Sequence, residues 1–349
     1  MGRMNTGEPP FDVAALRRYL QDHIDGLGPK LTAVPFAGGQ SNPTYLLSDG
    51  SRRFVLRKKP NGQLLPSAHA VDREYRVIRA LHGSAVPVAR PICICEDPAV
   101  IGTLFYAMEF VEGRIFWDPA LPELSGPERR ALYDDVNRMV AALHSLRPDE
   151  VGLADYGREG QFLQRQVARW TRQYEASETT PIEAMHRLAA WMPAQIPGRQ
   201  GHGIVHGDLR LDNMIFHPKE PRVIALIDWE LSTLGDPLAD LAYHMLPWRL
   251  TAQEFRGMAG SDLRQLEIPG EREYLARWCE RTGSDPVPEE VWNFYLVYNL
   301  FRLAAILQGI AKRADDGTAA SATARETGAK ARPIADIAWA LARQRLGAA

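Results

Sequence analysis

Apolar and polar positions divide the chain into a strand-rich first part and a helical remainder. Between residues 31 and 111, short apolar runs alternate with a period of two and are separated by turn residues, which is typical of strands and hairpins. The predicted strands cover 31–36, 44–47, 53–58 and 104–111, and the turn Ser48-Asp49-Gly50 joins two of them.

Helical spacing appears at 69–81, at 11–24, where Asp12 is a candidate N-cap, and throughout the chain after residue 124. The pattern therefore predicts an α+β protein with two lobes. We assign residues 1–111 to a small strand-rich lobe with one key helix, and residues 112–349 to a larger, mainly helical lobe.

Two stretches lack a clear period and are expected to be flexible. Residues 175–201 contain several prolines and small residues, and residues 314–331 are rich in Gly, Ala, Ser and Thr. No run approaches the roughly 18 apolar residues expected of a membrane helix. Cys93 and Cys95 share one face of an apolar strand, which favours buried thiols over a redox pair.

The chemistry is concentrated in residues 206–228, which read HGDLRLDNMIFHPKEPRVIALID. Asp208 follows an apolar pair, Asn213 completes a D-x-x-x-x-N spacing, and Asp228 ends a predicted strand over 223–227. Phosphoryl transfer requires a carboxylate that orients the acceptor hydroxyl and hard oxygen ligands for Mg²⁺. We predict Asp208 as the catalytic carboxylate, with Asn213 and Asp228 as metal ligands. Alone, the HGD sequence could equally be a turn in which Asp208 caps a helix.

The segments HGDLRLDN, VIALIDWE and LGDPLADLAY resemble the aminoglycoside phosphotransferase and choline kinase superfamily. Within it, the chain is most similar to the kinase-like domain that some proteins carry fused to an acyl-CoA dehydrogenase. FAGGQSNPTYLL, FVLRKKPNGQLLPSAHAVDREYRVIRAL, IDWELSTLGDPLADLAYHM and FYLVYNLFRLAAILQGIAKR carry this narrower likeness. The resemblance implies a protein-kinase-like fold, ATP and Mg²⁺ as cofactors, a small-molecule hydroxyl as acceptor, and a functional link to an acyl-CoA dehydrogenase.

A glycine-containing segment between two strands supplies a candidate phosphate loop. Small residues there would let backbone N–H groups approach phosphates closely, although the same residues would also make an ordinary hairpin. The sequence contains neither G-x-G-x-x-G nor a P-loop motif. The resemblance favours the phosphate-covering loop, with the candidate contacts Gly39, Gln40, Ser41 and Asn42.

Period-two alternation places Arg57 on the same strand face as Val55, so we choose Arg57 over Lys58 as the phosphate-binding cation. Lys59 has the same parity and is the second choice. The resemblance implies that Glu74, in the helix that follows, pairs with Arg57. It also implies that the Glu109 carbonyl and the Val111 amide contact the edge of adenine.

Several residues are predicted to support the catalytic loop. His206 is expected to bond the loop backbone rather than act as a base. Arg210 either neutralises charge or is solvated. Asp236 is placed to cap the next helix, and Asp240 is placed to brace the loop.

The acceptor pocket is the least specified part. Trp292, Tyr295, Asn299, Arg302 and Ile306 recur at helical spacing, and such a stripe forms either core or one face of a pocket. We retain Trp292, Tyr295 and Arg302 as candidate substrate contacts. Residues 291–313 contain no carboxylate, which argues against a cationic aminoglycoside and favours an anionic or acyl-bearing alcohol.

Composition narrows the choice of partners. The chain has 349 residues, 45% of them hydrophobic, and a net charge of −2, which offers no general attraction to nucleic acid or membrane. Its three cysteines form no disulfide or metal pattern, and the first residues lack a signal-peptide core, so a cytoplasmic setting is expected.

The sequence thus predicts an ATP- and Mg²⁺-dependent kinase for a small-molecule hydroxyl, with a hydroxyacyl-CoA or a hydroxy acid as the acceptor suggested by the resemblance. The alternatives are an aminoglycoside or choline-type kinase, and a catalytically silent nucleotide-binding module.

Overall fold

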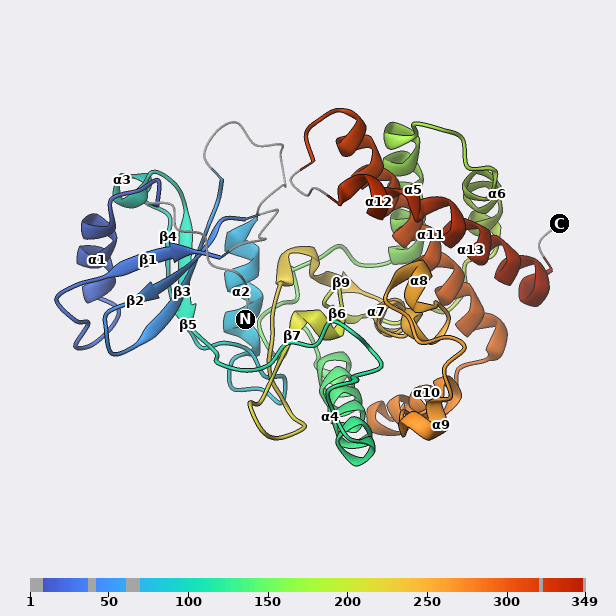
Figure 1. Cartoon of the computed structure of the whole chain (residues 1–349), viewed down its shortest axis with the longest axis horizontal. Coiled ribbons are helices and arrows are strands. Elements are labelled where there is room, and N and C mark those ends of the chain that lie inside the picture. The colour runs from blue at the N-terminus through green and yellow to red at the C-terminus, as the bar shows by residue number, and fades with distance from the viewer. Residues whose placement is uncertain (1–8, 37–41, 61–69, 320–322, 348–349) are drawn as a thin grey trace. The chain divides into compact units, whose positions relative to one another are not determined.

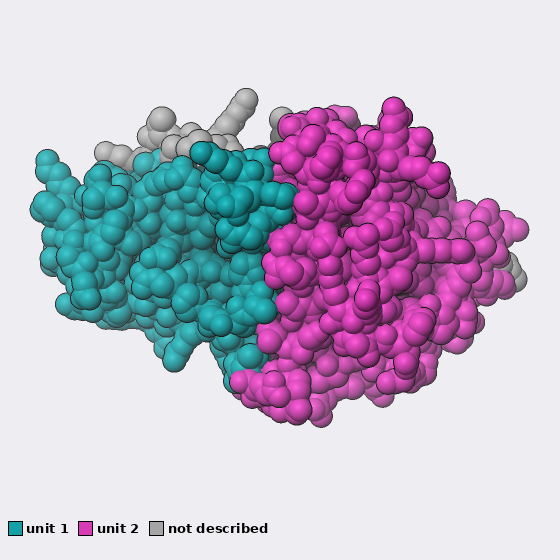
Figure 2. Space-filling model, turned by 90° about the horizontal axis from the view of Figure 1, so that it is seen from below, with its two compact units in different colours: residues 1–115, 151–153, 212–232 teal, residues 116–150, 154–211, 233–349 magenta. Residues whose placement is uncertain are grey.

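The computed structural model describes residues 9–36, 42–60, 70–319 and 323–347. The chain forms two compact units, coloured separately in Figure 2. Unit 1 contains residues 1–115, 151–153 and 212–232, and unit 2 contains residues 116–150, 154–211 and 233–349. Unit 1 therefore includes two later segments that the sequence pattern had placed in the helical lobe.

Unit 1 is built on an antiparallel five-stranded sheet with the order β1-β2-β3-β5-β4. The strands are β1 (Thr32–Pro35), β2 (Thr44–Ser48), β3 (Arg53–Lys58), β4 (Pro91–Cys95) and β5 (Phe105–Glu109). The helices are α1 (Val13–Gln21), α2 (Val71–Leu81) and α3 (Pro98–Ile101). The strands and the helices α1 and α2 agree closely with the predicted elements, and the Asp12 side chain caps α1 as expected, whereas α3 was not predicted.

The two faces of the sheet are covered by different helices (Figure 1). Phe54 and Leu56 of β3 belong to the core that includes Leu16 and Leu20 of α1. Arg57, which follows Leu56, has the opposite parity, and its side chain pairs with Glu74 of α2. Cys93 and Cys95 are buried, and all three cysteines of the chain are free. Period two therefore predicted correctly which β3 side chains face α2.

Two short antiparallel strand pairs follow in the middle of the chain. β7 (Met214–Phe216) pairs with β8 (Val223–Leu226) in unit 1, and the short helix η3 (Trp229–Leu231) comes next. β6 (Gly203–Val205) pairs with β9 (Thr233–Gly235) in unit 2. The short helix η2 (Leu211–Asn213) lies at the point where the chain passes from unit 2 to unit 1.

Unit 2 is mainly helical and is organised around α11 (Glu289–Asp315), which packs against α13, α12, α5 and α7. The other helices are α4 (Gly126–Ser145), α5 (Phe162–Ser177), α6 (Glu183–Trp191), η1 (Met192–Ala194), α7 (Pro237–His244), η4 (Leu246–Trp248), α8 (Ala252–Phe255), α9 (Leu263–Leu266), α10 (Glu271–Thr282), α12 (Ala324–Ala329) and α13 (Ala331–Leu346).

One expectation about apolar runs is wrong. Among the described residues, α11 is long and apolar enough to pass a membrane-helix test on length and composition. In the structure, 83% of its most apolar window is buried inside the protein, as in the core helix of a globular unit. A core helix of this kind is hydrophobic on all sides because other helices surround it.

The two stretches expected to be flexible contain helices. Residues 175–201 hold the end of α5, then α6 and η1, and the apolar side chains of α6 at Met185 and Leu188 are buried. Within 314–331, α12 forms on the surface of α11. A Cβ at Gly328 would lie 2.6 Å from the Ala311 Cα, so glycine at this position permits the close packing of α12 on α11.

Candidate functional site

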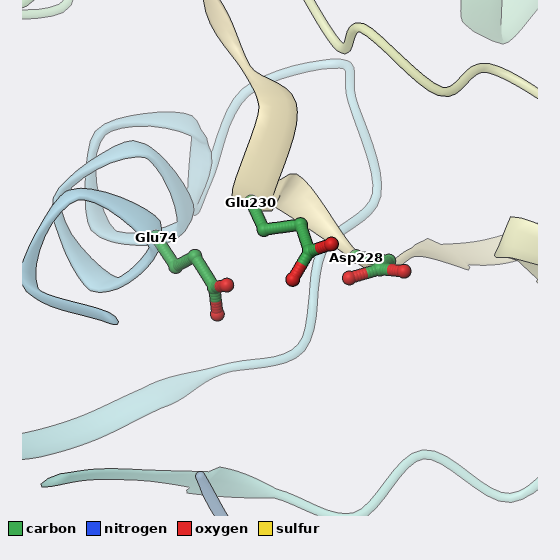
Figure 3. A group of neighbouring side chains, drawn as sticks. All are labelled: Glu74, Asp228 and Glu230. Carbon is green, nitrogen blue, oxygen red and sulfur yellow. The ribbon is translucent and has the colours of Figure 1, made fainter. Parts of the chain in front are cut away.

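Arg57 lies at the centre of a group of carboxylates within unit 1. Its Nε is 3.1 Å from Glu74 Oε2, and its Nη2 is 3.0 Å from Asp228 Oδ1 and 3.2 Å from Glu230 Oε2. In Figure 3 the three carboxylates point toward a common region from α2, from the end of β8 and from η3. The expected ion pair between Arg57 and Glu74 is therefore present, and Arg57 also binds Asp228.

Glu74 is the most enclosed of these carboxylates, with 1% of its side chain exposed. Asn42 Nδ2 donates to Oε1 at 3.1 Å, and the Tyr106 hydroxyl donates to Oε2 at 3.0 Å. Burial raises the pKa of Glu74 to about 7, although the positive charge of Arg57 opposes the rise. Asn42 and Tyr106 thus fix the orientation of the carboxylate that holds Arg57.

Asn42 was predicted as part of a phosphate loop through its backbone; its side chain supports Glu74, and the phosphate contact stays a prediction. The other predicted loop residues, Gly39, Gln40 and Ser41, lie outside the described residues. Glu109 ends β5 and pairs with Arg90 at 2.6 Å. The adenine contacts assigned to Glu109 and Val111 use backbone atoms and stay predictions.

Asp228 has a left-handed backbone conformation with φ of 68°. Such a conformation is uncommon for a residue other than glycine, although aspartate tolerates it better than most, and it often occurs at functional sites. The preceding residue, Ile227, donates its N–H to the Asn213 carbonyl at 2.9 Å. The two predicted metal ligands are therefore held in adjacent segments of unit 1.

Glu230 was not predicted, although it lies only two residues beyond Asp228. Ligand oxygens of Glu74, Asp228 and Glu230 all lie within 4.8 Å of one another. Carboxylate oxygens are ligands that Mg²⁺ prefers, so Asp228 and Glu230 suit the metal that the sequence implied, while Glu74 pairs with Arg57. The only sequence signal for Glu230 is its place in the IDWE motif. The pattern of apolar and polar residues around it does not distinguish it from a solvent-exposed glutamate.

The predicted catalytic loop lies in unit 2, directly after β6. Gly207 has φ of 83°, which a residue with a side chain rarely adopts. Arg210 Nη2 contacts Asp208 Oδ2 at 3.2 Å, and the Asp208 N–H bonds His206 Nδ1 at 3.2 Å. His206 is fully buried and bonds the loop backbone, as predicted.

Tyr243 of α7 is a further neighbour of Asp208 that the sequence did not reveal. Burial raises the pKa of Tyr243, and the negative charge of Asp208, to which its hydroxyl hydrogen-bonds, raises the pKa further. Tyr243 and Arg210 therefore both contact the carboxylate proposed to orient the acceptor.

Two aspartates of α7 support the loop as expected. Asp236 caps the helix by accepting from the Leu238 N–H at 3.0 Å. Asp240 Oδ2 accepts from the His206 N–H at 2.6 Å, and Oδ1 accepts from the Gly207 N–H at 2.9 Å. The loop backbone is thus fixed by a buried carboxylate.

Arg302, retained as a candidate acceptor contact, lies in a buried environment. Its guanidinium donates to the Gly207 carbonyl and lies 5.3 Å from the Trp170 ring centroid and 4.5 Å from that of Tyr243. Arg302 is 7% exposed. The structure therefore shows Arg302 holding the catalytic loop.

The other two candidate substrate contacts are also buried. Trp292 Nε1 donates to Glu271 at 2.7 Å, and the Tyr295 hydroxyl donates to Asp236 at 2.5 Å. Tyr295 is fully buried. These contacts agree with the alternative that the stripe on α11 is core.

The candidate residues thus fall into two groups. Unit 1 brings together Arg57, Glu74, Asp228 and Glu230, with Asn213 in the adjacent segment, while unit 2 holds Asp208 with Arg210 and Tyr243. The first group offers a cation and hard oxygen donors for a nucleotide and its metal. The second offers a carboxylate next to hydrogen-bond donors.

An antiparallel sheet with a paired cation and glutamate, a mainly helical unit that contains Asp208, and a D-x-x-x-x-N loop that runs from Asp208 to Asn213 define a kinase-type enzyme with a protein-kinase-like fold. The model of the phosphotransferase enzyme family APH matches residues 32–278. The chain belongs to this family of small-molecule phosphotransferases, as its motifs indicated.

Several curated relatives are named as acyl-CoA dehydrogenases and not as kinases. Mouse acyl-CoA dehydrogenase family member 10 is 45% identical over 93% of this chain and 30% of its own length. Mouse family member 11 is 42% identical over 96% of this chain and 44% of its own length. The Arabidopsis thaliana probable acyl-CoA dehydrogenase IBR3 is 43% identical over 94% and 42%. The chain spans less than half of each of these relatives.

Solved structures show the same fold. A Ralstonia eutropha protein, provisionally named an aminoglycoside phosphotransferase, is 47% identical, with a TM-score of 0.88 over 96% of this chain and 99% of that one. Choline kinase from Cryptosporidium parvum is 10% identical, with a TM-score of 0.67 over 96% and 97%. The phosphotransferase APH(4)-Ia, solved with AMP-PNP and hygromycin B, is 16% identical, with a TM-score of 0.61 over 95% and 100%.

Proposed function

We propose that this chain is an ATP- and Mg²⁺-dependent kinase whose acceptor is the hydroxyl of a hydroxyacyl-CoA or a hydroxy acid. The observation that carries the kinase assignment is the meeting of Arg57, Glu74 and Asp228, in which Arg57 and Asp228 are 171 residues apart in sequence. Phosphoryl transfer depends mainly on such positioning and on electrostatic stabilisation.

The residues of unit 1 suit a metal-bound nucleotide. Asn213, Asp228 and Glu230 would hold Mg²⁺ through hard oxygens, which would neutralise charge on the phosphates. Arg57, held by Glu74, would then contact a phosphate through its guanidinium, whose planar geometry permits two parallel hydrogen bonds. The backbone at Glu109 and Val111 would contact adenine.

Asp208 would orient the acceptor hydroxyl and receive its proton. A high pKa is not required for this role, because the proton moves late in a loose transition state. The Tyr243 hydroxyl and Arg210 fix the Asp208 carboxylate, and the Arg210 charge would also offset the negative charge that develops on the transferred group.

Two observations support an anionic acceptor. Residues 291–313 contain no carboxylate, and the Arg210 guanidinium lies next to Asp208. The relatives named acyl-CoA dehydrogenases support an acyl-bearing alcohol and a functional link to such a dehydrogenase.

An acceptor screen by mass spectrometry tests the proposal. The purified chain with Mg-ATP should phosphorylate at least one 3- or 4-hydroxyacyl-CoA or hydroxy acid and leave kanamycin and choline unmodified. The matched control is Asp208→Asn, which should lower product formation by at least about a hundredfold. Phosphorylation of kanamycin or choline, with all hydroxyacyl compounds inert, would refute the acceptor class and retain the kinase.

Measuring ATP turnover distinguishes a kinase from a catalytically silent nucleotide-binding module. The presence of Asp208, Asn213 and Asp228 together supports turnover. Binding of Mg-ATP without turnover in the presence of any acceptor would favour the module. We also propose a reducing, cytoplasmic setting, in keeping with three free, buried cysteines.

A further inference from the structure

The carboxylate that braces the catalytic loop is itself held by a histidine from another helix. Asp240 accepts from the His206 and Gly207 N–H groups, and His144 Nε2 of α4 lies 3.3 Å from its Oδ2. Burial would raise the pKa of Asp240, but the hydrogen bond from His144, together with the loop N–H donors, holds it below its usual value. Asp240 therefore carries a full negative charge toward the loop backbone.

The other nitrogen of His144 meets a tryptophan. Trp278 Nε1 of α10 donates to His144 Nδ1 at 3.1 Å, and Trp278 is 4% exposed. An indole N–H can only donate, so His144 Nδ1 must present its lone pair. The ring hydrogen of a neutral His144 then lies on Nε2, which faces Asp240.

The opposite tautomer would be unfavourable at both ends. A hydrogen on Nδ1 would face the indole N–H, and a lone pair on Nε2 would face the Asp240 carboxylate. Buried polar groups without a matching partner are costly, so the two contacts select one tautomer together.

We propose that Trp278 is a positioning residue for phosphoryl transfer, acting through the tautomer of His144 on Asp240 and so on the backbone N–H groups next to Asp208. The proposal rests on the proposed kinase function for its effect on turnover. The effect of Trp278 on the His144 tautomer and on the loop N–H groups does not depend on catalytic activity.

A purely structural role for Trp278 is the competing explanation, since its ring also makes a T-shaped contact with His144 at 5.8 Å. Trp278→Phe deletes the N–H and keeps most of the ring. Trp248→Phe is the matched control. Trp248 is also buried, and its Nε1 donates to the Pro269 carbonyl at 2.9 Å, away from the loop network.

The experiment uses the full chain labelled with ¹⁵N on histidine and on backbone amides. NMR should show the His144 hydrogen on Nε2 in the wild type and in Trp248→Phe, and a mixture of tautomers in Trp278→Phe. Amide exchange at His206 and Gly207 should become about tenfold faster only in Trp278→Phe, and kcat should fall about tenfold with nucleotide KM within about twofold.

His144→Gln provides a second test, because its amide N–H can donate to Asp240 without a choice of tautomer. Adding Trp278→Phe to this variant should then change loop exchange and kcat by less than about twofold. A hydrogen on His144 Nδ1 in the wild type, or equal behaviour of Trp278→Phe and Trp248→Phe in tautomer and exchange, overturns the proposal. Absence of phosphoryl transfer in the wild type would refute the kinase function alone. The tautomer and amide-exchange results would still decide whether Trp278 positions His144 and the loop.

Discussion

The Arg57 guanidinium lies 3.1 Å from the Glu74 carboxylate, of which 1% is exposed, so each charge depends on the other for its place in unit 1. Removing one member of a buried pair leaves the other uncompensated, which typically costs about 3–5 kcal/mol. The first prediction follows from this contact.

Arg57→Ala should weaken Mg-ATP binding and lower stability by a few kcal/mol, on the order of the cost above. Lys58→Met is the matched control, because Lys58 is buried on the opposite parity of β3 and methionine retains most of its volume. Calorimetry of nucleotide binding and denaturant unfolding provide the measurements. A larger loss of nucleotide affinity in Lys58→Met would show that strand parity does not identify the cation.

Asp208→Asn should lower turnover by roughly 10²–10⁴ with nucleotide affinity almost unchanged, because the amide keeps the size of the side chain and removes the proton acceptor. Steady-state kinetics and Mg-ATP titration are measured on the same preparation. Near-normal turnover would remove Asp208 from the role of base.

Asp228→Asn should abolish most turnover and weaken Mg-ATP binding, with partial recovery at high Mg²⁺, because a charged ligand is replaced by a neutral one. Asparagine tolerates the left-handed backbone at this position, whereas Asp228→Ala should cost about a further 1 kcal/mol of stability. Unchanged affinity and Mg²⁺ dependence in both variants would place the metal on other residues.

Arg302→Ala tests the role of a residue first expected to meet the acceptor. Because Arg302 donates to the Gly207 carbonyl, we expect kcat to fall by at least about tenfold, with the acceptor KM changing by less than about threefold. Arg302→Lys should recover part of kcat. A rise in acceptor KM at constant kcat would instead support direct contact with an anionic acceptor.

His244 gives a pH dependence of stability. Burial lowers its pKa to about 4, and its buried Nδ1 has no hydrogen-bond partner among the described residues. The unfolded chain binds this proton more readily, so its contribution to stability is complete above about pH 6.5 and is lost as pH falls toward 4.

Between these limits, His244→Gln should reduce the pH slope of the unfolding free energy by up to about 1.4 kcal/mol per pH unit, because one titrating group is removed. Glutamine can still bond the Tyr274 hydroxyl, which lies 2.9 Å from His244 Nε2. Denaturant unfolding of both proteins at several pH values measures the difference. Identical slopes would exclude His244 as the source.

Alternation and helical spacing were sufficient for most of unit 1, because one face of each strand is buried and a shift of one residue would expose it. This is why the choice of Arg57 over Lys58 agrees with the Arg57–Glu74 pair. Glu230 and Tyr243 could not be found in the same way, since their positions near Asp228 and Asp208 depend on tertiary structure. For Arg302, helical spacing identified the position on the helix but could not show that the guanidinium contacts the catalytic loop.

The helices missed in residues 175–201 and 314–331 have a common cause. Local composition indicated small and turn-forming residues, but packing against neighbouring helices supplies most of the stability of a short helix. The close approach of Gly328 to Ala311 is a tertiary contact that no local pattern reveals.

The separation of 171 residues between Arg57 and Asp228 has a consequence for biosynthesis. At a synthesis rate of about 5–20 residues per second, Arg57 is made roughly 9–34 s before Asp228. During that interval the emerging sheet and α2 can form, and Glu74 can pair with Arg57, but the segment 212–232 that completes unit 1 does not yet exist. The nucleotide half of this kinase is therefore finished on the ribosome only after much of unit 2 has been translated.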